Sequence, residues 1–210
     1  MREKRGKDMA IKHTAVSYYG LNYEEHAERD FREMKEHGCD TVILAITEFD
    51  MDFWMPNLNN IVKKAHEVGL RVIADPWGIG KYFGGEQVSL FLQNNIHNRQ
   101  VSAFTDEVLN FACFNTQSFR DYFRNCCMKI AQNTEVDGFF WDEPHYAYPK
   151  SYASITGGAG DDWSCRCPVC KKKFEELLGN LLVKPQGKPT LVPLSDKRPV
   201  WNTAQVDFKE

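Results

Sequence analysis

Three cysteines lie close together in the sequence, at Cys165, Cys167 and Cys170. A soft, borderline metal such as zinc takes four ligands in a tetrahedron, and thiolates on a tight turn supply three of them while little chain has to be ordered. The fourth ligand must come from elsewhere. Cys113 is the best candidate because it lies at an expected boundary between loop and helix, whereas the remaining cysteines lie inside a helical pattern or before a strand. The sequence therefore predicts a zinc site, and four thiolates leave no open position, so the zinc is expected to be structural.

An apolar run at 139–141 ends in two acidic residues, Asp142 and Glu143. In parallel α/β folds the strands end at the face where reactive side chains gather. A carboxyl group backed by apolar residues there is partly desolvated, which raises its pKa toward the range that a general acid needs. Adjacent strand residues point to opposite faces, so we do not expect these two to form the carboxylate pair of a glycosidase. His145 either orients Glu143 or a substrate, or is an exposed loop histidine.

Further candidate residues follow the earlier expected strands. Glu48 and Asp50 come after the second strand and Asp75 after the third. Each of these acids either serves as the second carboxylate, binds a sugar hydroxyl or caps a helix. Trp77 and Tyr19 also lie where strands end, and aromatic rings in such places both stack on sugars and close cores. The sequence alone leaves these alternatives open.

Apolar runs and helical periodicities alternate along the chain, with glycines between them. The expected strands are 15–19, 41–46, 71–74 and 138–141, and the expected helices are 23–37, 57–68, 117–132 and 171–178. This alternation is typical of βαβ units and of a parallel sheet. The segment from 79 to 115 carries glycines and polar residues, with a short helix expected near 88–94.

The fold class is expected to be α/β, of the (β/α)8 TIM-barrel type but incomplete. About four βα units are visible where a closed barrel needs eight, and such a barrel usually has about 250 residues. We expect a charged N-terminal extension (1–12), the N-terminal half of a barrel (13–182) with a Cys-rich metal-binding region (113–170), and an irregular tail or truncated continuation (183–210). The chain is then either a fragment, or the rest of the barrel comes from another chain.

The bulk composition narrows the class of partner. A net charge of −3 over 210 residues, with both signs interspersed, predicts neither nucleic-acid nor membrane binding. The segment after the first strand lacks the glycine spacing of nucleotide-binding loops. No stretch reaches the roughly 18 apolar residues of a membrane span. An odd count of 7 cysteines favours reduced thiols and a metal over disulfides, which predicts a cytoplasmic location.

Several of these features together resemble a known family. They are Cys113, Asn115, Ser118 and Arg120, then Asp142 and Glu143 after an apolar strand, then Cys165, Cys167, Cys170, Phe174 and Gly179. In this order they resemble glycoside hydrolase family 42, the β-galactosidases of clan A with a (β/α)8 barrel. The resemblance is firmest over residues 111–179.

The resemblance implies roles for individual residues. Glu143 corresponds to the acid/base of a retaining hydrolase, and the four cysteines correspond to the ligands of a structural zinc, in agreement with the argument from thiols. Where the family has an asparagine that contacts the 2-hydroxyl of the sugar, this chain has Asp142. The family's nucleophilic glutamate follows the seventh strand, and nothing in this sequence resembles that segment. The nucleophile is therefore expected outside this chain.

Three functions compete at this point. The first is a β-galactosidase-like hydrolase of glycosides, with Asp142, Asp75, Trp77, Glu48, Tyr19 and His145 as candidate substrate contacts. The second is a catalytically silent, zinc-stabilised barrel fragment that binds carbohydrate or a partner subunit. A homo-oligomer, in which the partner is another copy of the chain, belongs to this class. The third, a zinc ribbon for nucleic acid, is disfavoured because it needs two cysteine knuckles and a basic face.

Overall fold

The computed structural model describes residues 13–19, 23–81, 89–103, 105–142 and 165–181. The chain divides into two compact units, residues 1–173 and 174–210, and each is described by itself. The expected N-terminal extension and C-terminal tail both lie outside the described residues. The first unit contains the sheet and the cysteine-rich region.

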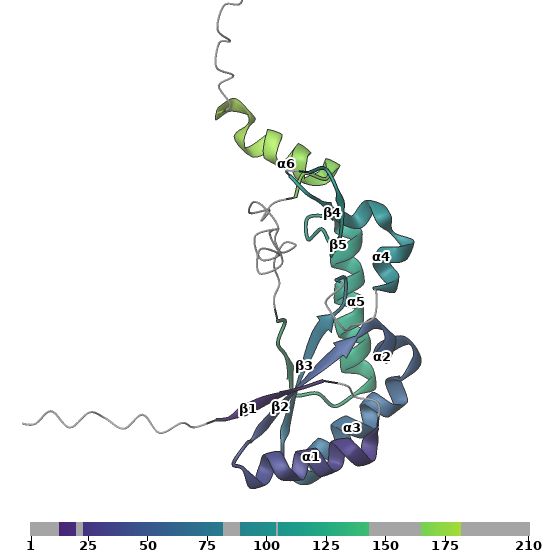
Figure 1. Cartoon of the computed structure of the whole chain (residues 1–210), viewed down its shortest axis with the longest axis vertical. Coiled ribbons are helices and arrows are strands. Elements are labelled where there is room, and N and C mark those ends of the chain that lie inside the picture. Colours follow the sequence, from purple (N-terminus) through teal and green to yellow (C-terminus); the bar gives the residue numbers. More distant parts are fainter. Residues whose placement is uncertain (1–12, 20–22, 82–88, 104, 143–164, 182–210) are drawn as a thin grey trace, which may run out of the picture. The chain divides into compact units, whose positions relative to one another are not determined.

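Four strands of the first unit form one parallel sheet (Figure 1). They are β1 (Ala15–Tyr18), β2 (Thr41–Thr47), β3 (Arg71–Gly78) and β6 (Gly138–Phe139), in the order β1-β2-β3-β6. The register aligns Ala15 with Thr41, and Thr41 with Arg71. All four strands therefore end at the same edge of the sheet, which we call the carboxyl edge. The parallel sheet predicted from the sequence is confirmed.

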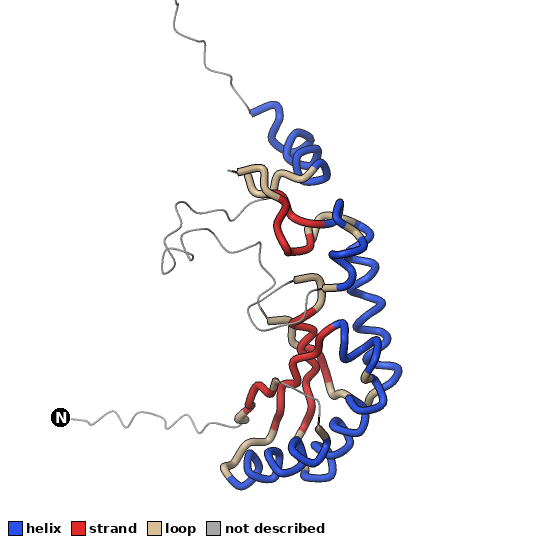
Figure 2. Tube along the Cα trace, turned by 45° about the vertical axis from the view of Figure 1, so that its right-hand side comes forward, coloured by secondary structure: helices blue, strands red, loops and turns tan. Residues whose placement is uncertain are grey.

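The crossover helices connect these strands. They are α1 (Glu24–Glu36), α3 (Met55–Val68) and α5 (Gln117–Asn133). The first two are followed by Gly38 and Gly69, whose φ angles of 86° and 83° are in the left-handed region that glycine adopts without strain. Figures 1 and 2 show the three helices on the same side of the sheet. Right-handed crossovers that always add the next strand on the same side produce this arrangement.

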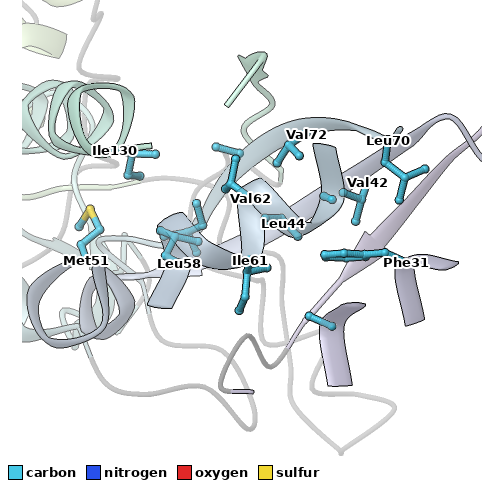
Figure 3. Packing of buried hydrophobic residues seen from close by; sticks show 14 of the residues in the cluster. Phe31, Val42, Leu44, Met51, Leu58, Ile61, Val62, Leu70, Val72 and Ile130 are labelled. Atoms are coloured by element: carbon cyan, nitrogen blue, oxygen red, sulfur yellow. The ribbon is translucent and has the colours of Figure 1, made fainter. Parts of the chain in front are cut away.

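The main hydrophobic core lies between these helices and the sheet. Strand side chains alternate between the two faces, and Val42, Leu44 and Val72 point toward the helices. Figure 3 shows Leu58 and Ile61 of α3 packed among them. Burying each such side chain stabilises the fold by about 1.5–3 kcal/mol relative to leaving it in water. This core fixes the register of the strands and thus the positions of the residues at their ends.

The opposite face of the sheet carries Ser17, Ile43 and Ile73, which are exposed or partly buried and do not belong to this core. A barrel would enclose this face, because its inward side chains fill the interior. Within the described residues the parallel sheet has four strands and does not close into a barrel. Barrel closure therefore stays a prediction.

The segment between β3 and α5 contains structure that the sequence analysis missed. Helix α4 (Leu90–Asn94) was expected, but the antiparallel hairpin of β4 (Arg99–Val101) and β5 (Val108–Ala112) was not. A short 3-10 turn, Ile96–Asn98, leads into the hairpin. Exposure alternates along β5, which is the period-2 pattern of a strand. The strand is so short that this pattern does not stand out in the sequence from the segments beside it.

A second missed element is α2 (Glu48–Phe53), which follows β2 directly and was not among the expected helices. Thr47 and Asp50 start this helix with a capping box. The Thr47 hydroxyl accepts from the Asp50 backbone N–H at 3.2 Å, and the Asp50 carboxylate accepts from the Thr47 N–H at 2.8 Å. This pattern satisfies two backbone donors that a helix start otherwise leaves unpaired. Asp50 is thus a capping residue, one of the alternatives left open above.

The last described helix is α6 (Pro168–Leu178), followed by a 3-10 turn at Gly179–Leu181. It begins three residues earlier than expected, so Cys170 lies in its first turn. The described part of the second unit, 174–181, exposes Phe174, Leu177 and Leu181. Among the helices of the described residues, none combines the length and apolar character that crossing a bilayer requires.

Candidate functional site

The four predicted cysteines form one cluster. Cys113 lies between β5 and α5, Cys165 and Cys167 precede α6, and Cys170 lies in the first turn of that helix. Their sulfur atoms all lie within 4.8 Å of one another. The Cys113 Sγ is 3.4 Å from the Cys170 Sγ and 3.6 Å from the Cys167 Sγ. Cys113 lies more than 50 positions before both Cys167 and Cys170 in the chain, so the fold itself assembles the cluster.

The hairpin supplies the framework for the cluster. The N–H of Cys113 donates to the carbonyl of Asn98 at 2.7 Å, which fixes the end of β5. On the other side, Cys165 forms a bridge with Ser102, and the Arg166 N–H donates to the Val101 carbonyl at 3.0 Å. The segment before α6 therefore lies along β4. Backbone hydrogen bonds hold both halves of the cluster to the same hairpin.

Several N–H groups point at the sulfur atoms. The Val101 N–H lies 3.3 Å from the Cys165 Sγ, and the Asn115 side-chain amide lies 3.2 Å from the Cys170 Sγ. Donors around a sulfur stabilise the thiolate form and tune the ligands of a metal. This arrangement suits sulfur atoms that carry negative charge.

The protonation of the cluster is uneven. The pKa of the Cys165 thiol lies well below its usual range, mainly because the Cys113 thiol donates a hydrogen bond to it and also because backbone N–H groups point at its sulfur. The pKa of Cys113 is raised, first by donating that hydrogen bond and second by burial. Burial also raises the pKa of Cys170. Metal binding removes the remaining thiol protons, because only thiolates are good ligands.

The donor set fits a tetrahedral metal ion. Metal–sulfur bonds of about 2.3 Å place tetrahedral thiolates roughly 3.8 Å apart, and the separations of Cys113 from Cys170 and Cys167, 3.4 and 3.6 Å, are close to that. Cys113 and Cys167 are 0% and 1% exposed, so water has little access to the centre. The cluster could hold a metal ion with a closed set of four ligands. Cys39, Cys126 and Cys127 are free cysteines outside this group.

A second group of predicted residues meets at the carboxyl edge of the sheet. Tyr19 follows β1, Asp75 and Trp77 lie at the end of β3, and Asp142 follows β6. The rings of Tyr19 and Trp77 meet edge to face with centroids 5.5 Å apart. The Asp142 N–H donates to the Asp75 Oδ1 at 3.1 Å. The structure thus places four of the candidate substrate contacts in two touching pairs at one edge.

Glu48 lies near the same edge but is engaged by the chain itself. Its side chain is buried, and its Oε1 accepts from the Gly80 N–H at 3.0 Å and the Ser89 hydroxyl at 2.6 Å. Its Oε2 accepts from the Phe91 N–H at 2.9 Å. These bonds tie the start of α2 to the turn after β3 and to α4. Glu48 and its neighbour Thr47 both line a pocket at this place.

Lys81 is a residue of this edge that sequence reasoning missed. It is only 7% exposed, and its Nζ lies 5.3 Å from the centroid of the Trp77 ring. The Nζ also donates to the carbonyl oxygen of Asp142 at 3.2 Å. A lysine in a glycine-rich segment after a strand has no distinguishing sequence signal, because its role depends on partners that tertiary folding brings to it.

The other predicted residues of this edge lie outside the described part of the chain. Glu143, the acid that the resemblance implies, follows Asp142 directly in the sequence, and His145 comes two residues later. Their roles therefore stay predictions. The described geometry fixes the backbone up to Asp142 and the residues around it.

Comparison with known proteins gives one family match, in the C-terminal part of the chain. A family model described as a protein of unknown function (DUF2800) matches residues 165–199. The matched segment includes Cys165, Cys167 and Cys170 but neither Cys113 nor the sheet. No curated protein matches the chain significantly. The function must therefore be argued from the residues and their geometry.

Proposed function

We propose that this protein binds glycosides at the carboxyl edge of its sheet and that Glu143 donates the proton in their hydrolysis. The observation that supports this best is the meeting of Tyr19, Trp77, Asp75 and Asp142 at that edge, immediately before Glu143 in the chain. Parallel α/β folds place their active sites at this edge. The resemblance of the sequence to family 42 agrees with the same location.

The residue types suit a sugar. Aromatic rings present flat apolar faces on which the C–H face of a pyranose packs, and carboxylates accept hydrogen bonds from its hydroxyls. Tyr19 is 49% exposed and supplies such a ring surface. Glycoside cleavage needs a proton donor for the departing oxygen, the role we assign to Glu143. By the resemblance, the reaction retains configuration and is β-galactosidase-like, and its nucleophilic carboxylate lies outside this chain.

We further propose that the metal of the cysteine cluster is zinc and that it is structural. A closed set of four thiolates is typical of structural zinc, and it leaves no position for a reacting water. When bound, the ion would cross-link the β4–β5 hairpin to the segment before α6. Four reduced thiolates require a reducing compartment, so we also propose a cytoplasmic location.

Replacing Glu143 by glutamine tests the proposed chemistry. Glutamine keeps the shape of the side chain but cannot donate a proton as an acid, so we expect kcat/KM for aryl glycosides to fall by about 10²–10⁴-fold. The readout is nitrophenol release from a panel of nitrophenyl glycosides by the metal-loaded protein in its complete form, with the part that carries the nucleophile. Glu67→Gln is the control, because Glu67 is an exposed partner of Lys64 on α3, where its loss should leave turnover unchanged. Equal turnover by wild type and Glu143→Gln would remove Glu143 from the mechanism.

A silent carbohydrate-binding fragment is the second candidate. It is favoured by one observation, that the parallel sheet of the described residues has four strands, half of those in a complete barrel. In that case isothermal calorimetry detects sugar binding, while no glycoside in the panel is cleaved by the protein or by any longer product of the same gene.

A further inference from the structure

Asn115 joins the two segments that supply the cysteine cluster. Its side-chain amide nitrogen lies 3.2 Å from the Cys170 Sγ, and its Oδ1 accepts from the Lys173 Nζ at 3.1 Å. Asn115 comes shortly after Cys113 in the chain, whereas Cys170 and Lys173 lie about one turn apart on α6. All four residues belong to the first compact unit. Both ends of one amide group therefore contact the same side of α6, next to a cysteine of the cluster.

The partners of this amide fix which way it points. An ammonium has only donors, so the Asn115 carbonyl oxygen must face Lys173 and its NH₂ group must face the sulfur. The reverse orientation would place the oxygen, which only accepts, against a sulfur that carries negative charge. The nearby ammonium also polarises the amide, which makes its N–H a stronger donor. Asn115 thus offers a donor to Cys170 in the thiolate form that a metal ion needs.

The backbone that carries Asn115 is held by the chain itself. The Arg120 guanidinium donates to the carbonyl oxygens of Phe114 and Asn115 at 3.0 and 3.1 Å. The Thr116 N–H and hydroxyl both donate to the Cys113 carbonyl oxygen, at 3.0 and 2.7 Å. These bonds fix the turn between β5 and α5 in which Cys113 lies. The direction of the Asn115 side chain therefore follows from contacts within the protein.

Asn115 and Arg120 belong to the sequence pattern that begins at Cys113, and the four thiol ligands alone leave both of them without a role. We propose that Asn115 is a positioning residue for the metal ion. It fixes the Cys170 sulfur within the cluster and stabilises its negative charge, and Lys173 supports its amide. The inference rests on the metal site proposed above, and it adds that the affinity of this site depends on a side chain that is not a ligand. Hydrogen-bonding partners of metal ligands typically contribute about 10–100-fold to metal affinity.

The test measures the zinc affinity of the reduced full chain and of Asn115→Leu. Leucine has a similar size but no donor, so we expect the dissociation constant for zinc to rise about 10–100-fold. The constant is read from competition with a chromogenic chelator. Asn133→Leu is the matched control, because the Asn133 amide donates to the Lys129 carbonyl at 2.7 Å at the exposed end of α5. This control should bind zinc as wild type does.

Two substitutions of Lys173 test the support of the amide. Lys173→Met removes the ammonium, and we expect it to weaken zinc binding about two- to fivefold, in line with an exposed charged contact. Lys173→Arg keeps the charge and should bind zinc as wild type does. Cobalt(II) in place of zinc gives a second readout, because its absorption bands report the geometry of the ligands. Asn115→Leu should shift these bands, and Asn133→Leu should not.

The outcomes separate this inference from the metal site itself. If wild type binds no zinc, the metal site and the inference both fail. If wild type and Asn115→Leu bind zinc equally tightly, the metal site stands and the inference is overturned. Amide hydrogen exchange in β2, read by NMR, checks that the variants fold. Faster exchange there in Asn115→Leu than in Asn133→Leu would also overturn the inference, because Asn115 would then act on the whole fold.

Discussion

At the scale of single residues, position in the sequence was enough to predict the metal ligands but not the contact between Lys81 and Asp142. Cys113 could be chosen as the fourth ligand because it lies at a helix boundary while the other free cysteines do not. Lys81 could not be found in this way, since its partner Asp142 lies 61 residues further along. Glu48 shows a third case, a candidate substrate contact whose two oxygens are engaged by the chain's own donors.

Asp137 gives a pH-dependent prediction at this scale. The Val72 N–H donates to its carboxylate at 2.7 Å and lowers its pKa, with His66 adding to the effect. A lowered pKa in the folded state stabilises the fold above the unfolded-state pKa of about 3.9, and this contribution is lost as the pH falls through the folded-state pKa. Urea unfolding of wild type and Asp137→Asn should therefore differ at pH 6 and converge toward pH 2.5.

The expected difference at pH 6 is about 1 kcal/mol, because the Asp137 side chain is 41% exposed and water screens it. Asp121→Asn serves as the control, since Asp121 makes an exposed ion pair with Arg124 and should contribute little. A gap between wild type and Asp137→Asn that widens as the pH falls would contradict the account.

At the scale of elements, long periodic segments were predictable and short ones were not. The helices α1, α3 and α5 and the four parallel strands follow from apolar spacing, with boundaries shifted by a few residues. The β4–β5 hairpin was missed because three residues of β4 carry no readable period. Helix α2 was missed although Thr47 and Asp50 show the capping pattern, because the aromatic residues around it look like an exposed loop.

Metal removal should act on the hairpin and spare the sheet. The cysteine cluster is a separate buried group from the core beneath α1, α3 and α5. We expect the native protein to contain one zinc per chain by elemental analysis and Cys167→Ser to contain none. In that variant, amide exchange should rise about tenfold or more in 99–101 and 108–112 but stay unchanged in β2.

Cys127→Ser is the control for this prediction, because Cys127 lies in α5 outside the cluster and should leave the metal content at one. A native protein without metal would rule out the site. Equal exchange in the hairpin with and without the ion would show that the metal does not brace it.

At the scale of the whole molecule, the order of strands carries the most information. Strands added one after another on the same side, with the helices on one face, make the arrangement found in each half of a (β/α)8 barrel. The sequence predicted the alternation of strand and helix, but no local pattern states whether a sheet closes, since closure depends on strands far away in sequence or in another chain. Both proposed functions share this framework and differ in what completes it.

Glycoside binding at the carboxyl edge is the claim common to both functions, and a calorimetric titration tests it most directly. Wild-type protein should bind a nitrophenyl glycoside, and Tyr19→Ala should weaken binding about tenfold because the ring against Trp77 is lost. Tyr23→Ala, which removes an exposed ring packed on His26 instead, should bind as wild type does. Absence of binding to every glycoside of the panel, or equal affinity in Tyr19→Ala, would contradict the account.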